Sequence, residues 1–273
     1  MTSKFKINTE TKVTVVIPFR DRGTDLRRGA DLTIVTAWWW AHGFTPQVVD
    51  DGLDGDAPFN RHRAYNRAVA RFPETNIFVF TEADMLIPPS QIRQAVQLAS
   101  QQDGIVVPFT TYRYLSDATT GVVRDGYHEM EPKPLAEWWS LAPNHSASLF
   151  TMNAESVMEH GKSIGAINIM SRSTIETCGG FTEATHGNWY DDNIIEEGYA
   201  FLTGQKTRWV EGPAVHMYHL PGWTGDHLTD ADRAATAMNR SLLRAMRRNI
   251  RLRDKGAVRH LMLHRAPGRG DDE

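Results

Sequence analysis

Residues 76–84 have the sequence NIFVFTEAD, in which the apolar run 77–80 leads directly into Thr81-Glu82-Ala83-Asp84. A short apolar run with β-branched and aromatic residues predicts a buried strand. Two upstream segments have the same form. The run 13–19 (VTVVIPF) precedes Arg20-Asp21-Arg22, and the run 45–49 (TPQVV) precedes Asp50-Asp51-Gly52. Each predicted strand therefore ends in charged residues.

Helical spacing of apolar residues separates these strands. It covers residues 25–40, 60–72 and 90–100, and a fourth apolar run follows at 104–109. Regular alternation of strand and helix predicts an α/β fold, with a mostly parallel Rossmann-like sheet flanked by helices. Ligands bind beyond the carboxyl ends of the strands in such sheets, so we expect the charged residues after the strands to line one site.

The second half of the chain continues the pattern less regularly. Periodicity is weak from 111 to about 158, which we interpret as an acceptor-side insertion or a loop. Beyond it we expect strands at 165–171, 207–210 and 214–218, and helices at 172–177, 191–202 and 231–253. We divide the chain into a domain at 1–225 and a basic helical extension at 226–273.

Composition indicates an ordinary folded protein. Of 273 residues, 41% are hydrophobic and 23% are charged, close to the average for globular proteins. The single cysteine, Cys178, excludes an intrachain disulfide. No apolar run approaches the roughly 20 residues of a membrane span, and the N-terminal residues are polar, so we expect a cytoplasmic protein without a membrane span. The sequence has neither GxxxxGK[ST] nor a strand-linked GxGxxG, which disfavours a P-loop kinase and a dinucleotide enzyme.

Charge is unevenly distributed along the chain. The net charge is −3, yet residues 239–269 carry ten Lys or Arg and one acid, Asp254, whereas the remainder carries 20 basic and 32 acidic residues. A basic segment on an acidic body indicates either a polyanionic partner, such as nucleic acid, or an internal docking surface. Both alternatives remain open for residues 240–269.

The carboxylates at 82 and 84 have the spacing of a divalent-metal site. Hard carboxylate oxygens suit Mg²⁺ or Mn²⁺, and such an ion neutralises a leaving diphosphate. Acid-x-acid triplets are common in solvated turns, so the triplet alone is weak. Its position directly after a predicted strand strengthens the prediction.

Several motifs in order resemble the GT-A glycosyltransferases of the family 2 type. They are VVIPFRDR at 15–22, VVDDG at 48–52, FNRHRAYN at 59–66 and FVFTEADMLIPP at 78–89. The segments GAINIMSRSTIETCGGFTE at 165–183 and WYDDNIIEEGYAF at 189–201 resemble the C-terminal part of the β-1,4-galactosyltransferases and related bacterial and phage enzymes. The resemblance covers about residues 13–220.

The resemblance implies a nucleotide-sugar half at about 13–110 and an acceptor half at about 160–225. It assigns Asp51 to the nucleoside and Asp84 to the metal, as the last acid of a DxD-like motif in which Glu82 replaces the usual first Asp. The donor-binding residues that it implies are Pro18, Phe19, Arg20, Arg22, Asp51, Asn60, Arg61, Arg63, Glu82, Ala83 and Asp84.

The resemblance also implies the catalytic base. The galactosyltransferase pattern ends in Gly-Glu-Asp-Asp, and its first Asp removes the proton of the acceptor hydroxyl. Asp191 matches that base and Asp192 its neighbour, while Trp189-Tyr190 replaces Gly-Glu. A histidine usually completes the metal site, and His216 and His219 are the candidates. Residues at i and i+3 of an extended strand point to opposite faces, so we expect one of the two to be the ligand and favour His219.

We therefore predict a metal-dependent, inverting glycosyltransferase that uses Mn²⁺ or Mg²⁺ and a UDP-sugar, in the cytoplasm of a bacterium or of a phage-infected cell. The acceptor is open: a glycan, a protein hydroxyl, or a modified base in DNA reached through the basic segment. A non-enzymatic alternative is a nucleotide-sugar-binding module that has lost its chemistry.

Overall fold

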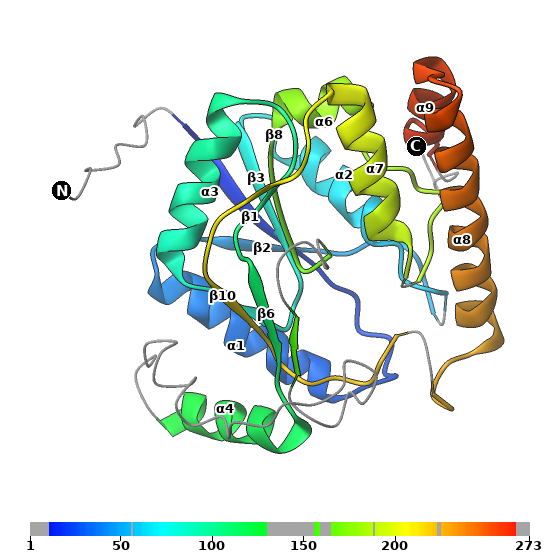
Figure 1. Cartoon of the computed structure of the whole chain (residues 1–273). Coiled ribbons are helices and arrows are strands. Elements are labelled where there is room, and N and C mark those ends of the chain that lie inside the picture. The colour runs from blue at the N-terminus through cyan, green and yellow to red at the C-terminus, as the bar shows by residue number, and fades with distance from the viewer. Residues whose placement is uncertain are drawn as a thin grey trace.

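The computed structural model describes residues 11–55, 57–129, 156–158, 165–187, 189–222 and 225–265. A six-stranded sheet forms its centre, in the order β2-β1-β3-β8-β5-β9 (Figure 1). Its strands are β1 (Val13–Pro18), β2 (Pro46–Val49), β3 (Ile77–Thr81), β5 (Val106–Val107), β8 (Ile167–Ser171) and β9 (Arg208–Trp209).

The pairings of this sheet confirm the predicted fold class. Strand β1 pairs in parallel with both β2 and β3, and β5 pairs in parallel with β9. Strand β8 is antiparallel to both β3 and β5 and lies between them. The fourth predicted strand, β5, therefore runs in the same direction as β3 but is not its neighbour, because β8 comes from the second half of the chain and lies between them.

Helices cover both faces of the sheet. On one side lie α1 (Arg27–Ala41) and α3 (Pro89–Gln101), and on the other lie α2 (Arg61–Arg71), α6 (Arg172–Cys178) and α7 (Asp191–Thr203) (Figure 1). Each long helix buries an apolar stripe at helical spacing, as α1 does with Ile34, Val35 and Trp38. Burial of this stripe against the sheet fixes how far the helix is rotated, and hence which polar residues face the site.

The core centres on β3 and the aromatic residues packed around it. Phe80 and Phe181 are fully buried, and their rings lie 5.2 Å apart in an edge-to-face arrangement. Tyr65 of α2 contacts both rings, at 4.3 Å and 5.1 Å. This cluster ties the loop before α7 to the strand that ends in the Glu82–Asp84 triplet.

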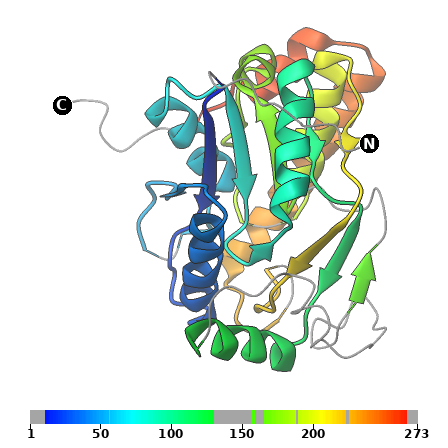
Figure 2. The ribbon, with the colours of Figure 1, turned by 90° about the vertical axis from the view of Figure 1, so that its left-hand side faces the viewer.

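A second, four-stranded sheet follows that triplet, in the order β4-β10-β6-β7 (Figure 2). Its strands are β4 (Met85–Leu86), β6 (Thr111–Tyr114), β7 (Ser156–Met158) and β10 (Pro213–His216). His216 pairs with Met85 across the antiparallel β4–β10 ladder, and the N–H of Met217 donates to the carbonyl of Asp84 at 2.8 Å. Residues 131 and 133 positions apart in the sequence are thereby brought next to one another.

The region from 111 to 158 contains more structure than its sequence pattern predicts. Strand β6 is followed by α4 (Asp117–Glu129), and β7 pairs with β6. The amphipathic pattern of α4 is interrupted by glycine, which explains why periodicity alone did not reveal it. Residues 130–155 of the expected insertion lie outside the described residues.

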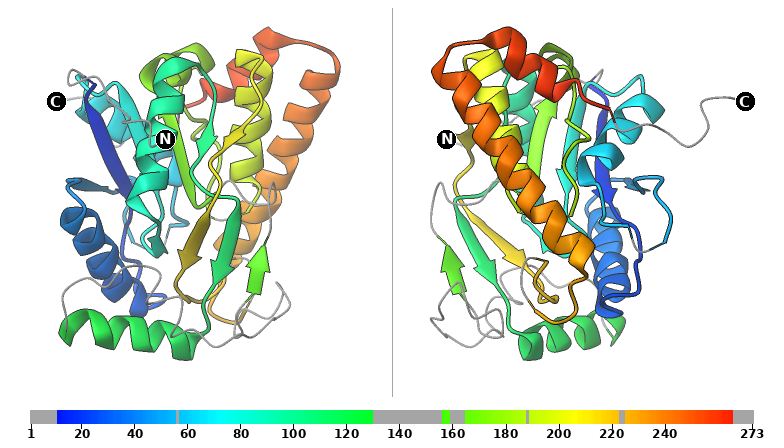
Figure 3. Two further views of the ribbon diagram at one scale, coloured as in Figure 1. Left: turned by 60° about the vertical axis from the view of Figure 1, so that its left-hand side comes forward. Right: turned by 90° about the vertical axis from the view of Figure 1, so that its right-hand side faces the viewer.

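The C-terminal helices lie on the outside of α7 (Figure 3). Helix α8 (Asp230–Arg251) begins with a capping box between Thr229 and Asp232, and α9 (Lys255–Met262) follows after a short turn. The predicted long helix is confirmed, whereas the domain boundary at 225/226 stays a prediction. Within the described part of the chain, none of the helices combines the length and the apolar character that crossing a bilayer demands.

Candidate active site

A histidine–carboxylate cluster lies where β3 and β10 end. Nε2 of His219 lies 3.2 Å from Oδ2 of Asp84, and Nε2 of His216 lies 3.7 Å from Oδ1. The potential ligand atoms of these three residues all lie within 4.8 Å of one another. Asp84 is 1% exposed, and within the described part of the chain neither of its carboxylate oxygens accepts a hydrogen bond. A buried carboxylate without a donor is costly, so the cluster has the character of a cation site.

The structure brings both histidines to Asp84. The inference that they would point to opposite faces is wrong, because the strand ends at His216 and its alternation does not extend to His219. The two rings lie 5.0 Å apart. Strand alternation applies only inside a regular strand, and the sequence pattern did not reveal where β10 ends.

The protonation states suit metal ligation. Burial lowers the pKa of His216, and burial together with Arg28 lowers the pKa of His219 to about 3. Both imidazoles are therefore neutral at physiological pH, the form that binds a metal. One oxygen and two imidazole nitrogens form a donor set that Mn²⁺ accepts, with further positions left for other ligands.

Arg28 on α1 is a site residue that the sequence analysis missed. Its Nη2 lies 3.4 Å from Oδ2 of Asp84. Arg27 and Arg28 are adjacent in sequence, and Arg27 instead pairs with Asp25 and Asp117. Only the packing of α1 decides which of the two faces Asp84, so no sequence signal distinguishes them.

A second cluster of carboxylates surrounds Arg61, the first residue of α2. The guanidinium donates to Glu82 at 2.7 Å, to Asp192 at 2.6 Å, and from Nε to Oδ2 of Asp191 at 3.0 Å. Arg61 is 8% exposed and Asp191 is 1% exposed. Asp191 begins α7, where the helix dipole stabilises a carboxylate. The first turns of α2 and α7 therefore meet through one ion-pair network.

Negative charge exceeds positive charge in the combined site. Glu82, Asp84, Asp191 and Asp192 face Arg28 and Arg61. Burial, with the neighbouring carboxylates, raises the pKa of Glu82 to about 8 and that of Asp192 to about 7 against the lowering effect of Arg61. Burial is the larger cause of both shifts and the neighbouring carboxylates add to it, so a divalent cation bound nearby would favour the ionised forms.

Several of the predicted donor-binding residues bond to one another. Asp51 is fully buried, and its carboxylate accepts from Nε of Arg20 at 2.8 Å and from the N–H of Asn60 at 2.7 Å. Arg20 also lies over the ring of Phe59, 6.0 Å from its centroid. Asn60 caps α2 by accepting from the N–H of Arg63. These residues fix the loops that follow β1 and β2 relative to α2.

The other predicted residues lie in varied surroundings. Phe19 packs against the core, and its N–H donates to Val49. Arg22 pairs with Asp232 at 2.9 Å and so connects the loop after β1 to the start of α8. Pro18 and Ala83 are buried, and the side chain of Arg63 is half-buried. The donor-binding role of each of these residues stays a prediction.

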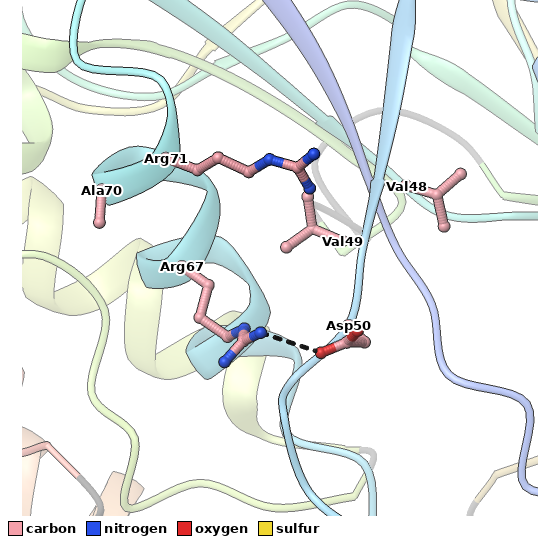
Figure 4. Close-up of a pocket in the computed structure, with 6 residues that line it drawn as sticks. All are labelled: Val48, Val49, Asp50, Arg67, Ala70 and Arg71. Carbon is pink, nitrogen blue, oxygen red and sulfur yellow. Dashed lines mark ion pairs between the residues drawn. The ribbon is translucent and has the colours of Figure 1, made fainter. Parts of the chain in front are cut away.

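A surface cavity lies elsewhere on α2. It has a volume of about 270 Å³ and occupies the outer edge of β2 (Figure 4). Arg67 reaches across it to Asp50, 3.3 Å away. It is lined by Val48, Val49, Asp50, Arg67, Ala70 and Arg71. Residues of the Asp84 cluster and of the Arg61 network do not line this cavity. The cavity is therefore separate from those two groups.

Comparison with known proteins returns glycosyltransferase structures. No protein-family model matches the chain, and no curated protein matches its sequence. The catalytic domain of Drosophila β1,4-galactosyltransferase 7 with xylobiose superposes with a TM-score of 0.41 at 14% identity, over 73% of this chain and 64% of that one. A mutant of that enzyme with manganese, UDP-Gal and xylobiose gives 0.38, with the same identity and coverage.

A glycosyltransferase involved in glycosylation of the major capsid of PBCV-1 gives a TM-score of 0.37 at 10% identity, over 83% of this chain and 98% of that one. This chain covers 64% of the Drosophila catalytic domain, which is less than two thirds of its length. Likeness at these scores establishes no shared activity, and the function has to be argued from the residues of the site.

Proposed function

We propose that the chain is a metal-dependent glycosyltransferase that moves a sugar from a UDP-sugar to a hydroxyl group. The observation that carries the proposal is the convergence of two groups at one edge of the sheet. The Asp84 cluster has the donor set of a divalent-metal site, and the Arg61 network holds a buried carboxylate, Asp191, beside it through Glu82. A divalent-metal site next to a positioned base suits a reaction in which a hydroxyl group attacks the sugar of a nucleotide-sugar and displaces the diphosphate.

Asp84, His216 and His219 are the residues that would hold the cation. The two neutral imidazoles fit this role, as do the carboxylate oxygens of Asp84, which accept no hydrogen bond from the described residues. When bound, Mn²⁺ or Mg²⁺ neutralises the charge that develops on the leaving diphosphate. Arg28 supplies a further positive charge at the same place.

Asp191 is the proposed base. Oδ2 accepts both hydrogen bonds from Arg61, whereas Oδ1 is buried and accepts no hydrogen bond from any residue that the structure describes. We therefore assign to Oδ1, the oxygen that Arg61 leaves unbonded, the removal of the proton of an acceptor hydroxyl as that hydroxyl attacks the anomeric carbon. Attack assisted by a base on the face opposite the leaving diphosphate inverts the anomeric configuration, so we propose an inverting reaction.

The loops around Phe59 are the proposed nucleoside end. Arg20 and Asp51 follow the carboxyl ends of β1 and β2, the usual ligand edge of such a sheet, and the guanidinium of Arg20 lies over the ring of Phe59. The carboxylate of Asp51 holds Arg20 and Asn60, so it supports this end of the site by fixing the positions of its neighbours. Aromatic and guanidinium faces are suited to contact with a base.

Nucleic acid is the second candidate acceptor, and one observation favours it. Arg240, Arg244, Arg248 and Arg251 are exposed along one side of α8, and among the described residues none of the four forms an ion pair. At 1.5 Å per residue the row is about 16 Å long, enough to contact several phosphates. DNA binding that weakens with salt, and is lost when all four are replaced by glutamine, would support this candidate.

The test of the main proposal is a panel of nucleotide-sugars with and without Mn²⁺. The proposal predicts that one UDP-sugar raises the melting temperature only when metal is present and that UDP is slowly released by hydrolysis. Stabilisation without release under any condition would favour the binding-module alternative. No response to any nucleotide-sugar would contradict both.

A further inference from the structure

Arg61 occupies an unusual place for a cation. It is the first residue of α2, where the helix dipole disfavours positive charge, and its side chain is 9% exposed. Burial of a guanidinium is tolerated when hydrogen-bond acceptors satisfy its N–H donors. Three carboxylates and the carbonyl of Gly165, 3.1 Å from Nη1, fulfil that need.

The guanidinium joins the two sides of the site. Nη1 holds Glu82, which directly follows β3 on the metal side, while Nε and Nη2 hold Asp191 at the start of α7. Gly165 leaves room for the carboxylate of Asp192, because a Cβ at position 165 would overlap Oδ2 of Asp192. One planar group therefore sets the distance between the end of β3 and the start of α7.

Among the described residues, no group donates a hydrogen bond to one of the two carboxylate oxygens of Asp191. Both bonds from Arg61 fall on Oδ2, which fixes the plane of the carboxylate and directs the unbonded Oδ1 away from the guanidinium. Asp192 differs, because its side chain is 30% exposed and its Oδ1 is bonded to Arg61. The geometry thus singles out Asp191 rather than Asp192.

From this geometry we infer that Arg61 is a positioning residue for catalysis: it orients Asp191 so that Oδ1 faces the acceptor hydroxyl, in addition to any contact with the donor. The inference rests on the proposed function, since it assigns a role within the same site. A bidentate hold on one oxygen is specific to the flat, forked guanidinium, and lysine cannot reproduce it. Small errors in the placement of a base reduce turnover strongly.

The experiment compares Arg61→Lys with Arg71→Lys, using the UDP-sugar identified by the panel. Arg71 lies on the same helix but at the surface cavity (Figure 4), so its replacement is a matched control. We expect Arg61→Lys to lower kcat about 100-fold, with the KM for the donor and the metal-dependent rise in melting temperature close to those of the wild type. We expect Arg71→Lys to match the wild type in every measurement.

Chemical rescue gives a second readout that a purely structural role would not produce. In Arg61→Ala, guanidinium ion at a non-denaturing concentration should restore part of kcat, whereas methylammonium should not. If Arg61→Ala does not fold, the kcat of Arg61→Lys decides the question.

The possible outcomes separate the inference from the proposed function. A raised donor KM with a wild-type kcat in Arg61→Lys would make Arg61 a donor-binding residue and overturn the inference. Wild-type kcat and KM in that variant would also overturn it. Failure of the wild-type protein to respond to any nucleotide-sugar would instead contradict the proposed function itself.

Discussion

Replacing Asp191 by asparagine removes the proposed base while almost preserving its size. The amide oxygen can still accept from Arg61, and Arg61 keeps Asp192 and Glu82, so the network loses one charged contact of several. An amide cannot take up the proton of the acceptor. General-base catalysis contributes about 10²–10⁴-fold to turnover, and we expect kcat to fall by that factor, or about 3–5 kcal/mol in activation free energy.

The assay measures UDP release from the identified UDP-sugar, with water or an acceptor as the attacking group. Glu197→Gln is the matched control, because Glu197 lies on the same helix and pairs at the surface with Arg247. We expect the control to keep turnover within about twofold, since an exposed ion pair contributes little. The metal-dependent melting shift should persist in both variants. Turnover of Asp191→Asn within a few-fold of the wild type would show that Asp191 is not the base.

Three further predictions address the metal site, the pH dependence of stability and the core. Replacing Asp84 by Asn, or His219 by Ala, should abolish the shift in melting temperature caused by Mn²⁺ with the UDP-sugar; an unchanged shift in both variants would place the metal elsewhere. Burial lowers the pKa of His62 to about 4, so the unfolded chain binds a proton below pH 6.5 that the folded chain does not. The free energy of unfolding therefore decreases as pH falls from 6.5 towards 4. In His62→Gln this decrease between pH 7 and pH 4.5 should be smaller by about 2.5 kcal/mol, measured by denaturant unfolding. Equal decreases in both proteins would contradict the assignment. Phe181→Ala should lower the free energy of unfolding by about 3–5 kcal/mol, because the ring is fully buried among aromatic side chains, and a loss below 1 kcal/mol would indicate a core that repacks.

Much of the fold was predictable because apolar periodicity depends on burial. The runs at 13–19 and 76–80 each became a strand of the central sheet, and the charged residues after them lie at its carboxyl edge. Periodicity says nothing about which strands are neighbours. Nothing in residues 165–171 signals that β8 runs antiparallel between β3 and β5, because that position is set by long-range pairing.

In the candidate site, too, some features were predictable from the sequence and others depend on the tertiary structure. The sequence alone determined that Glu82 and Asp84 follow a buried strand, and that Asp191 and Asp192 begin a helix, because these are local properties of the chain. Only the tertiary structure decided that both His216 and His219 reach Asp84, that Arg28 rather than Arg27 faces it, and that Arg61 joins Glu82 to Asp191. Those contacts depend on where a strand ends and how a helix is rotated against the sheet, and packing of the whole core sets both.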